Sequence, residues 1–470
     1  MTLAETRAAT LGELRKSGYE VLPIREEMRK NLIAHLRAGD DVFPGIIGYD
    51  ETVVPQLENA ILSGQDVILL GERGQAKSRI IRSLTSLLDE WTPVLEGAEI
   101  PENPFHPITP QGRYIAEEEG EAAAIRWMHR DERYGEKLAT PDITIADLIG
   151  EVDPIKVAEG RYLSDELTIH FGLIPRTNRG IFAINELPDL AERIQVGLLN
   201  AMEERDIQIR GHKVRLELDV FIVATANPED YTNRGRIITP LKDRYGSQIH
   251  THYPTSIEAE IAIIELESAT LDVEGYTVEV PDYMTELVAE ITRLARRSPD
   301  VNQRSGVSVR ASVADYEALL ANALRRAVRL GETDVVPRVS DLPFLVPALQ
   351  GKVEFETVED GRDEQVIERL VQGAVVAVFN RRCNLSELEP IVEAFKVGLS
   401  VDTGEALPSK DYLRMVKDVE GLGAAVDGLV PSASDAVKAS AVEFLLEGLH
   451  LNKRLNKDPV SGSAAARYRG

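Results

Sequence analysis

The loop at residues 71–78 has residue types and a spacing that could bind phosphate. It reads Gly-Glu-Arg-Gly-Gln-Ala-Lys-Ser, and it joins an apolar run at 67–70 to apolar residues at helical spacing. A strand, a loop and a helix in this order turn main-chain N–H groups inward, which makes a nest for phosphate oxygens. Lys77 would then reach the β- and γ-phosphates of a nucleotide, and the Ser78 hydroxyl would bind Mg²⁺. Taken alone, the loop is also compatible with an incidental turn.

This loop departs from the phosphate-binding pattern G-x-x-x-x-G-K-[ST] at one position. Gly71 is the first glycine of the pattern, but Ala76 stands where the second glycine is usual. Alanine tolerates helical backbone angles but not a positive φ, so we expect Ala76 to adopt ordinary geometry. The main chain of Gly74 and Gln75 would complete the nest.

Polar residues follow two later apolar runs. Glu186 comes shortly after the run at 181–184, and Asn227 comes shortly after the run at 220–224. Short, wholly apolar runs are typical of parallel strands buried on both faces, and ligands bind at the carboxyl ends of such strands. We expect Glu186 to orient and polarise an attacking water, and Asn227 to hold that water or the γ-phosphate.

Two arginines could complete a site for a nucleotide triphosphate. Arg244 ends the sequence Pro-Leu-Lys-Asp-Arg, and Arg310 stands near the start of a predicted helix. Arg244 would be presented to the nucleotide of a neighbouring subunit, where it would neutralise charge that develops in the transition state. Arg310 would clamp the γ-phosphate from a helical lid.

The elements that position these residues alternate between strand and helix. Strand, helix and strand patterns repeat from 66 to 253, which predicts an α/β fold with a parallel sheet and helices on both faces. Helical patterns dominate the rest of the chain. The predicted division is an N-terminal helical segment (1–40), an α/β nucleotide-binding domain (41–253), a helical lid (254–345) and a C-terminal helical region (346–470).

Several segments are predicted to lie outside the main elements. We interpret 91–140 as an irregular, proline-rich insertion and 143–170 as a second one, while the alternation around 207–218 predicts a hairpin. Residues 402–410 have the composition of a linker, and the tail from Asp458 is predicted to be mobile. His106 and His129 lack the close spacing of metal ligands.

Composition argues against several kinds of protein. The net charge of −25 disfavours broad binding to DNA or anionic lipid, because both need a positive surface. The single cysteine, Cys383, excludes an internal disulfide framework, and we interpret it as a small buried residue rather than a nucleophile. The first residues lack the apolar core of a signal peptide, and no apolar run has membrane-spanning length. We therefore expect a cytoplasmic protein with no nucleic-acid partner.

In order and spacing, these motifs resemble those of the AAA+ ATPases. The resemblance covers about 41–335 and is closest to the AAA+ subunit of magnesium chelatase and its MoxR-type relatives. The segments that resemble the family's motifs are GERGQAKS, RGIFAINELPDL, LLNAMEERDIQIRG, VATANPED and PLKDRYG. By this resemblance, 74–78 is the Walker A motif, 181–186 the Walker B motif, Asn227 sensor 1, Arg244 the arginine finger and Arg310 sensor 2.

The resemblance implies a function as well as a fold. It implies a P-loop NTPase that binds ATP and Mg²⁺, assembles into a ring, expected to be a hexamer, and hydrolyses ATP. The work done would be remodelling of a partner protein that bears a von Willebrand factor A domain, or assistance to metal insertion. A transcription activator of the AAA+ enhancer-binding type would need a Gly-Ala-Phe-Thr-rich loop before 181 and a basic DNA-binding helix pair, and the sequence has neither.

One residue departs from the family pattern in a way that bears on catalysis. Asn185 stands next to Glu186, where the family has an aspartate. An amide oxygen can accept a hydrogen bond from a Mg²⁺-bound water, but it brings no charge to the cation. Metal binding would then depend more on Ser78 and the phosphates. A non-hydrolysing, nucleotide-gated scaffold is therefore the alternative to a motor.

Overall fold

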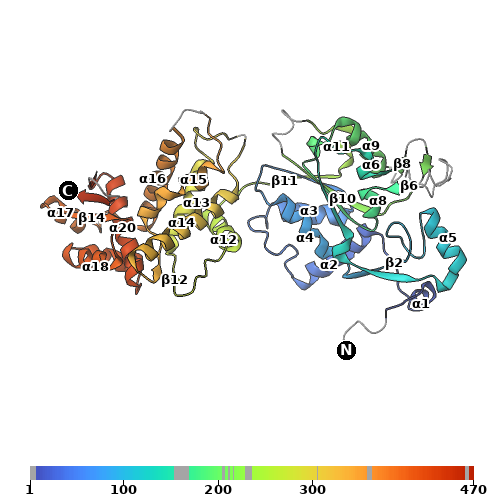
Figure 1. The fold of residues 1–470 in the computed structure, drawn as a ribbon, viewed down its shortest axis with the longest axis horizontal. Helices are drawn as coiled ribbons and strands as arrows, with labels where there is room; N and C mark the ends of the chain where they lie inside the picture. The colour runs from blue at the N-terminus through green and yellow to red at the C-terminus, as the bar shows by residue number, and fades with distance from the viewer. Residues whose placement is uncertain are drawn as a thin grey trace. The chain divides into compact units, whose positions relative to one another are not determined.

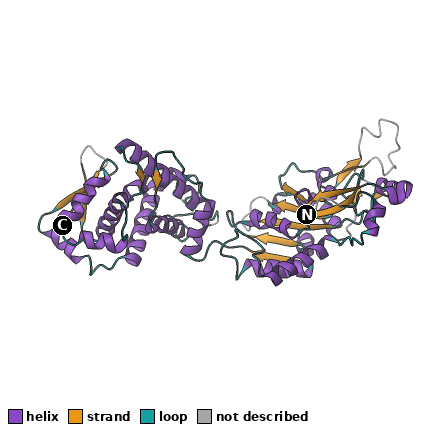
Figure 2. Cartoon of the chain, turned by 90° about the horizontal axis from the view of Figure 1, so that it is seen from below, coloured by secondary structure: helices purple, strands orange, loops and turns teal. Residues whose placement is uncertain are grey.

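The computed structural model describes residues 7–152, 169–203, 207–209, 212–214, 216–227, 235–303, 305–356, 362–460 and 465–470. The chain divides into two compact units, Met1–His252 and Tyr253–Gly470 (Figure 1). Strands form a layer in the first unit, and helices make up most of the second (Figure 2).

A five-stranded parallel sheet forms the centre of the first unit. Its strand order is β11-β1-β10-β7-β4, and each neighbouring pair is parallel. The strands are β1 (Val67–Leu70), β4 (Tyr134–Leu138), β7 (Gly180–Asn185), β10 (Val220–Ala226) and β11 (Ser247–His250). This sheet, with helices on both faces, confirms the predicted α/β fold class.

Alternating residues of each strand enter two different cores. In β1, Val67 and Leu69 belong to one cluster, and Ile68 and Leu70 belong to the other. This alternation follows from the strand geometry, in which successive side chains point to opposite faces. The first cluster packs under α2 (Ile24–Ala38), α3 (Val53–Ser63) and α4 (Lys77–Ser83). The second packs under α6 (Ile145–Leu148), α8 (Leu173–Arg176), α9 (Glu192–Glu203) and α11 (Thr239–Arg244).

The predicted irregular insertion at 91–140 is wrong for residues 134–138. These residues form β4, the edge strand of the central sheet, beside β7. The rest of that segment contains the antiparallel pair β2 (Trp91–Leu95) and β3 (Ile125–His129), together with α5 (Pro110–Glu119). α1 (Leu11–Lys16) packs near this pair, because Leu14 shares a small core with Leu95 and Ile125.

Two smaller strand pairs complete the first unit. β5 (Gly150–Val152) pairs with β6 (Ile169–Phe171), and β8 (Ile207–Ile209) pairs with β9 (His212–Val214). The second pair confirms the predicted hairpin. The turn is predicted at 210–213, which is wrong for His212 and Lys213, because both belong to β9; residues 210 and 211 lie outside the described residues.

Helices α12–α20 form most of the second unit. They are α12 (Ile257–Glu267), α13 (Asp282–Ala295), α14 (Val309–Leu330), α15 (Val346–Gln350), α16 (Arg362–Arg382), α17 (Glu389–Lys396), α18 (Ser409–Asp418), α19 (Leu422–Leu429) and α20 (Asp435–Leu451). One core cluster includes residues from 264 to 468. The finer division into a lid at 254–345 and a C-terminal region at 346–470 stays a prediction. Among the helices that the structure describes, none has both the length and the apolar character of a membrane span.

The predicted linker at 402–410 and the predicted mobile tail are both wrong in part. Residues Ser400–Gly404 form β14, and α18 begins at Ser409. In the tail, β15 (Asn456–Pro459) and β16 (Ala465–Arg469) pair with each other, and β16 also pairs with β14. The small parallel pair β12 (Thr277–Val278) and β13 (Asp334–Val335) lies elsewhere in this unit.

Burial raises the pKa of Cys383 to about 11, so its thiol stays protonated at neutral pH.

Candidate functional site

Three neighbouring strands end where the sequence predicts the chemistry. The loop 71–76 follows β1, Asn227 follows β10, and Glu186 follows β7. Because these strands are adjacent and parallel, their carboxyl ends lie along one edge of the sheet. A hydrogen bond from the Gly71 N–H to the Ala226 oxygen, at 3.1 Å, joins the loop to the end of β10.

The loop is held in a tight turn by side chains from outside it. A Cβ atom on Gly71 would lie 1.9 Å from Thr251 Oγ1 and 2.2 Å from Gln75 Oε1, so a larger residue here would displace both side chains. Thr251 donates to Gln75 Oε1 at 2.7 Å, and the Tyr49 hydroxyl lies 3.0 Å from the Gln75 main-chain oxygen. Burial raises the pKa of Tyr49 to about 12, so its hydroxyl remains a donor at neutral pH. Gly74 has a φ of 75°.

The expectation that Ala76 adopts ordinary geometry is wrong. Its φ and ψ are 54° and 12°, in the left-handed region, immediately before α4 begins at Lys77. Ala76 lies between Gln75, which Thr251 and Tyr49 hold in place, and the first residue of α4. The loop therefore has a positive φ at the position where the usual pattern has glycine. Alanine adopts this conformation at a cost in conformational free energy.

Ala76→Gly is expected to raise the free energy of unfolding by up to about 1 kcal/mol. The left-handed region costs alanine about 1–2 kcal/mol, and glycine's greater freedom in the unfolded chain offsets part of the gain. Urea unfolding would measure the change. The matched control is Ala116→Gly in α5, where glycine should instead lower stability by about 0.5–1 kcal/mol. A loss of stability for both variants would contradict the argument about strain.

Lys77 and Ser78 open α4 at the end of this loop. Lys77 is buried, and its Nζ donates to the main-chain oxygens of Gly71 and of Glu72, the latter at 2.7 Å. Its cationic head thus lies against the loop. Ser78 is exposed one residue further into the helix. A cation, a hydroxyl and main-chain N–H groups at a helix start suit the oxygens of a phosphate chain.

Glu186 leaves the sheet in a strained conformation. Its φ of 54° and ψ of 50° are left-handed, and its main-chain N–H donates to Thr225 Oγ1 at 3.0 Å. The chain then enters a 3₁₀ turn, Leu187–Asp189. A left-handed non-glycine residue costs about 1–3 kcal/mol and persists only where its surroundings enforce it. Asn227 is 2% exposed at the neighbouring strand end.

Asn185, the residue that departs from the family pattern, is held between two strands. Its Nδ2 donates to Glu136 Oε1 on β4, and its Oδ1 accepts from Thr225 Oγ1 on β10 at 3.3 Å. Glu136 also accepts from Arg82 Nε at 3.0 Å and from the Tyr134 hydroxyl at 3.1 Å. Partial burial would raise the pKa of Glu136, but these hydrogen bonds outweigh it, so the pKa lies below its usual value.

Sequence reasoning misses two residues of this cluster. The apolar pattern places Thr225 only at the end of a strand. Its hydroxyl, two residues before Asn227, could have indicated a polar contact at that strand end. Glu136 falls within the predicted insertion at 91–140, and no local pattern connects it with Asn185, which lies 49 positions away.

The donors at this edge suit Mg²⁺ together with a nucleotide, rather than a metal alone. No group of three or more His, Cys, Asp or Glu side chains that could hold a metal ion occurs among the described residues. Mg²⁺ prefers oxygen ligands and is usually bound through one or two protein groups plus substrate phosphates. The Ser78 hydroxyl and the Asn185 amide oxygen are ligands of that kind.

Of the two predicted arginines, Arg244 belongs to the same unit as the sheet and lies away from this edge. Arg244 ends α11, three residues before β11 begins at Ser247, and its side chain is about one-third exposed. Because β11 runs parallel to β1, Arg244 lies near the amino edge, opposite the phosphate loop. Arg310 is an exposed residue in the first turn of α14, in the second unit.

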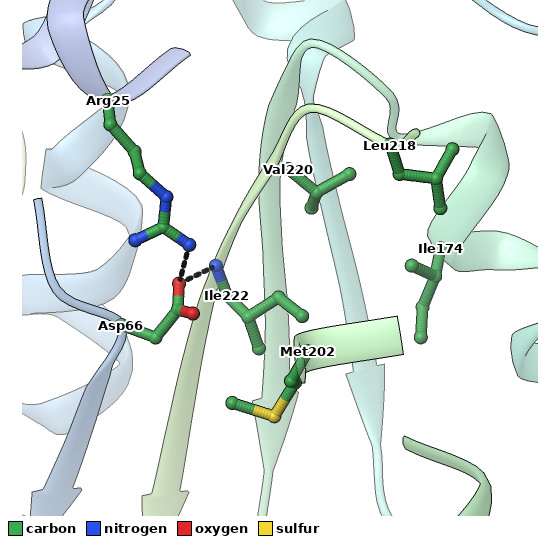
Figure 3. A pocket seen from close by; sticks show the side chains of 7 residues that line it. All are labelled: Arg25, Asp66, Ile174, Met202, Leu218, Val220 and Ile222. Atoms are coloured by element: carbon green, nitrogen blue, oxygen red, sulfur yellow. Dashed lines mark hydrogen bonds and ion pairs between the residues drawn. The ribbon is translucent and has the colours of Figure 1, made fainter. Parts of the chain in front are cut away.

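A small cavity at the amino edge is a structural feature rather than a ligand site. Its polar part is the ion pair of Arg25 and Asp66, 2.7 Å apart, and Asp66 Oδ1 also accepts from the Ile222 N–H at 2.9 Å (Figure 3). The rest of the lining is apolar, from Ile174, Met202, Leu218, Val220 and Ile222. The space is about the size of one water molecule. It lies where β1 and β10 begin, away from the loop at 71–76.

Comparisons with known proteins agree with the motifs. A family model described as the Sigma-54 interaction domain matches residues 158–241, which include Glu186 and Asn227. The magnesium-chelatase 38 kDa subunit of Cereibacter sphaeroides is 26% identical over 236 residues, which are 47% of this chain and 62% of that protein. Magnesium-chelatase subunit ChlI of Synechocystis is 28% identical over 258 residues, 50% of this chain and 64% of that protein.

The chain thus spans less than two thirds of these two relatives. Among solved structures, a cryo-EM-based model of the complex between subunits BchI and BchD of magnesium chelatase is 18% identical, with a TM-score of 0.36, and covers 69% of this chain and 98% of that one. The family model covers β7 and β10, two strands of the parallel sheet. In its motifs and in part of its sequence, the chain resembles the AAA+ subunits of magnesium chelatase.

Proposed function

We propose that this chain binds ATP and Mg²⁺ at the carboxyl edge of its sheet and hydrolyses ATP as a motor subunit. The observation that carries the proposal is the alignment of three strand ends, which brings the loop of Lys77, Asn227 and Glu186 to one edge. Residues more than a hundred positions apart converge there. The resemblance to magnesium-chelatase subunits supports the same assignment.

Each residue at this edge has a role that follows from its chemistry. Gly71, Gly74, Gln75 and Ala76 would shape the loop so that main-chain N–H groups face the phosphates, and Lys77 would neutralise their charge. Ser78 and the Asn185 amide oxygen would hold Mg²⁺, which would neutralise phosphate charge when bound. Glu186 would take up a proton from, and orient, the attacking water. Asn227 would hold that water or the terminal phosphate.

Two further residues would complete the site in an assembly. Arg244 would act on the nucleotide of a neighbouring copy, and its position at the opposite edge of the sheet supports a role in trans. Arg310 would contact the γ-phosphate from the second unit. We propose a cytoplasmic ring, expected to be a hexamer, that remodels a partner protein carrying a von Willebrand factor A domain or assists metal insertion, as magnesium-chelatase-like and MoxR-like proteins would.

The alternative is a nucleotide-gated scaffold that binds ATP without hydrolysing it. Asn185 favours this alternative, because it removes a carboxylate charge next to Glu186. A transcription role is not proposed. The matched family model covers the two strand ends, but no Gly-Ala-Phe-Thr motif precedes residue 181.

Nucleotide binding itself is tested with Lys77→Ala. Removing a buried cation from its phosphate partner costs about 2–5 kcal/mol, so affinity for a fluorescent ATP analogue should fall at least about thirtyfold. Isothermal or fluorescence titration gives the dissociation constant. Lys30→Ala, at an exposed lysine of α2 in the same unit, is the matched control and should bind normally. Equal affinity of both variants would refute the site.

A further inference from the structure

The carboxylate of Glu136 lies on the same face of the sheet as Asn185. Glu136 pairs in register with Ala183, two residues before Asn185 on β7. Side chains two apart on a strand share a face, and paired residues of parallel strands do so as well. Ala183 belongs to the core that α4 covers, and Arg82 of α4 reaches Glu136 from that side. The carboxylate is therefore held between the edge strand and the helix that follows the phosphate loop.

This carboxylate determines how the Asn185 amide is oriented. An ionised carboxylate only accepts hydrogen bonds, so the Nδ2 of Asn185 must face Glu136. The Oδ1 must then face β10, where the Thr225 hydroxyl donates to it at 3.3 Å. In the strand order, β10 lies between β7 and β1. The amide oxygen thus faces β10, the strand between β7 and the strand β1 that leads into the loop at 71–76.

The same contact explains why an aspartate would not suit position 185. A carboxylate at that position would stand at hydrogen-bond distance from Glu136, and two ionised carboxylates at that distance repel each other. Hydrogen bonds from Arg82 and Tyr134 hold Glu136 at this position. Asparagine at 185 and glutamate at 136 therefore form a complementary pair. The negative charge that the family has at position 185 is here carried by Glu136, on the neighbouring strand β4.

We propose that Glu136 is a positioning residue that acts through Asn185 to supply this negative charge and to point the amide oxygen toward the Mg²⁺ of a bound nucleotide. The inference rests on the proposed nucleotide site and deepens it. It accounts for the Asn185 substitution as part of a working metal site.

Glu136→Gln tests the proposal through metal dependence rather than through turnover. The measured quantity is the ratio of two dissociation constants for a fluorescent, non-hydrolysable ATP analogue, one in EDTA and one in Mg²⁺. Substitution of a residue that orients a metal ligand typically weakens metal binding roughly ten- to a hundredfold. The ratio of the dissociation constant in EDTA to that in Mg²⁺ should therefore fall by about tenfold. The constant measured in EDTA should change little, because Glu136 does not contact the phosphate loop.

A charge swap keeps the test decisive even if Glu136→Gln folds poorly. Asn185→Asp alone should lower the melting temperature of the nucleotide-free protein, because it opposes two carboxylates. The double variant Asn185→Asp with Glu136→Gln again has one carboxylate and one amide, with the hydrogen bond reversed. It should recover both the melting temperature and most of the Mg²⁺ dependence.

The control is Glu132→Gln, which removes the same charge just before β4. Glu132 is exposed and also pairs with an arginine, Arg126, at 2.9 Å. The Glu132→Gln variant should leave the ratio of the two dissociation constants unchanged. The proposal is overturned if Glu136→Gln gives the same ratio of dissociation constants as this control. It is also overturned if the double variant recovers no more melting temperature and Mg²⁺ dependence than Asn185→Asp. Failure of the proposed nucleotide site would look different, because the wild-type protein would then not bind the analogue at all.

Discussion

Glu186→Gln is expected to lower ATP turnover at least about a hundredfold while leaving nucleotide affinity nearly unchanged. A positioned general base contributes roughly 10²–10⁴ in rate, and glutamine cannot take a proton from water. Glutamine keeps the size of the side chain, and the Glu186 main-chain bond to Thr225 is unaffected by the substitution. Phosphate release measures turnover, and titration with an ATP analogue measures affinity.

The matched control for this prediction is Glu192→Gln. Glu192 is exposed at the start of α9, a few residues along the chain from Glu186, and its removal should leave turnover intact. A wild-type protein whose turnover does not exceed that of Glu186→Gln would rule out the motor. If ATP still bound, the nucleotide-gated scaffold would then be the function that fits.

Arg244→Ala is expected to reduce hydrolysis by roughly 10³–10⁵, the range for an arginine that neutralises transition-state charge in phosphoryl transfer. ATP binding should be spared. The physical reason is that Arg244 lies near the amino end of β11, whereas the subunit's own phosphate loop follows the carboxyl end of β1. In the proposed ring, an arginine so placed would act on the nucleotide of another copy.

A mixing experiment separates action in trans from simple damage to the fold. Arg244→Ala subunits keep an intact nucleotide loop, and Lys77→Ala subunits keep the arginine. In a randomly mixed ring with head-to-tail contacts, about a quarter of the interfaces would combine both intact parts, so turnover should partly return. Arg236→Ala, at an exposed arginine nearby, is the control and should retain activity. No recovery on mixing, or equal loss of binding and hydrolysis, would assign Arg244 to another role.

The central strands were predictable because burial on both faces leaves a local trace. Such strands are continuous apolar runs, so 67–70, 181–184 and 220–224 could be recognised without any knowledge of their neighbours. Parallel pairing then requires their carboxyl ends to share an edge. This is why a loop, a glutamate and an asparagine far apart in the sequence could be assigned to one site.

The edge strand β4 was not predictable in the same way. Its residues, Tyr-Gly-Glu-Lys-Leu, mix apolar and charged side chains because one of its sides has no neighbouring strand. β14 and β16 were missed for a related reason, since a strand made of polar residues is recognisable only once its partner is known. In all three, pairing across the chain determined the structure.

By itself, then, the sequence determined the α/β fold class, the phosphate loop and the strand-end residues Glu186 and Asn227, because each has a local signature. Tertiary structure alone decided the left-handed conformation of Ala76, since contacts from Thr251 and Tyr49 shape the loop. It alone placed Glu136 against Asn185. Contacts between residues so far apart depend on strand order, and no local pattern encodes that order.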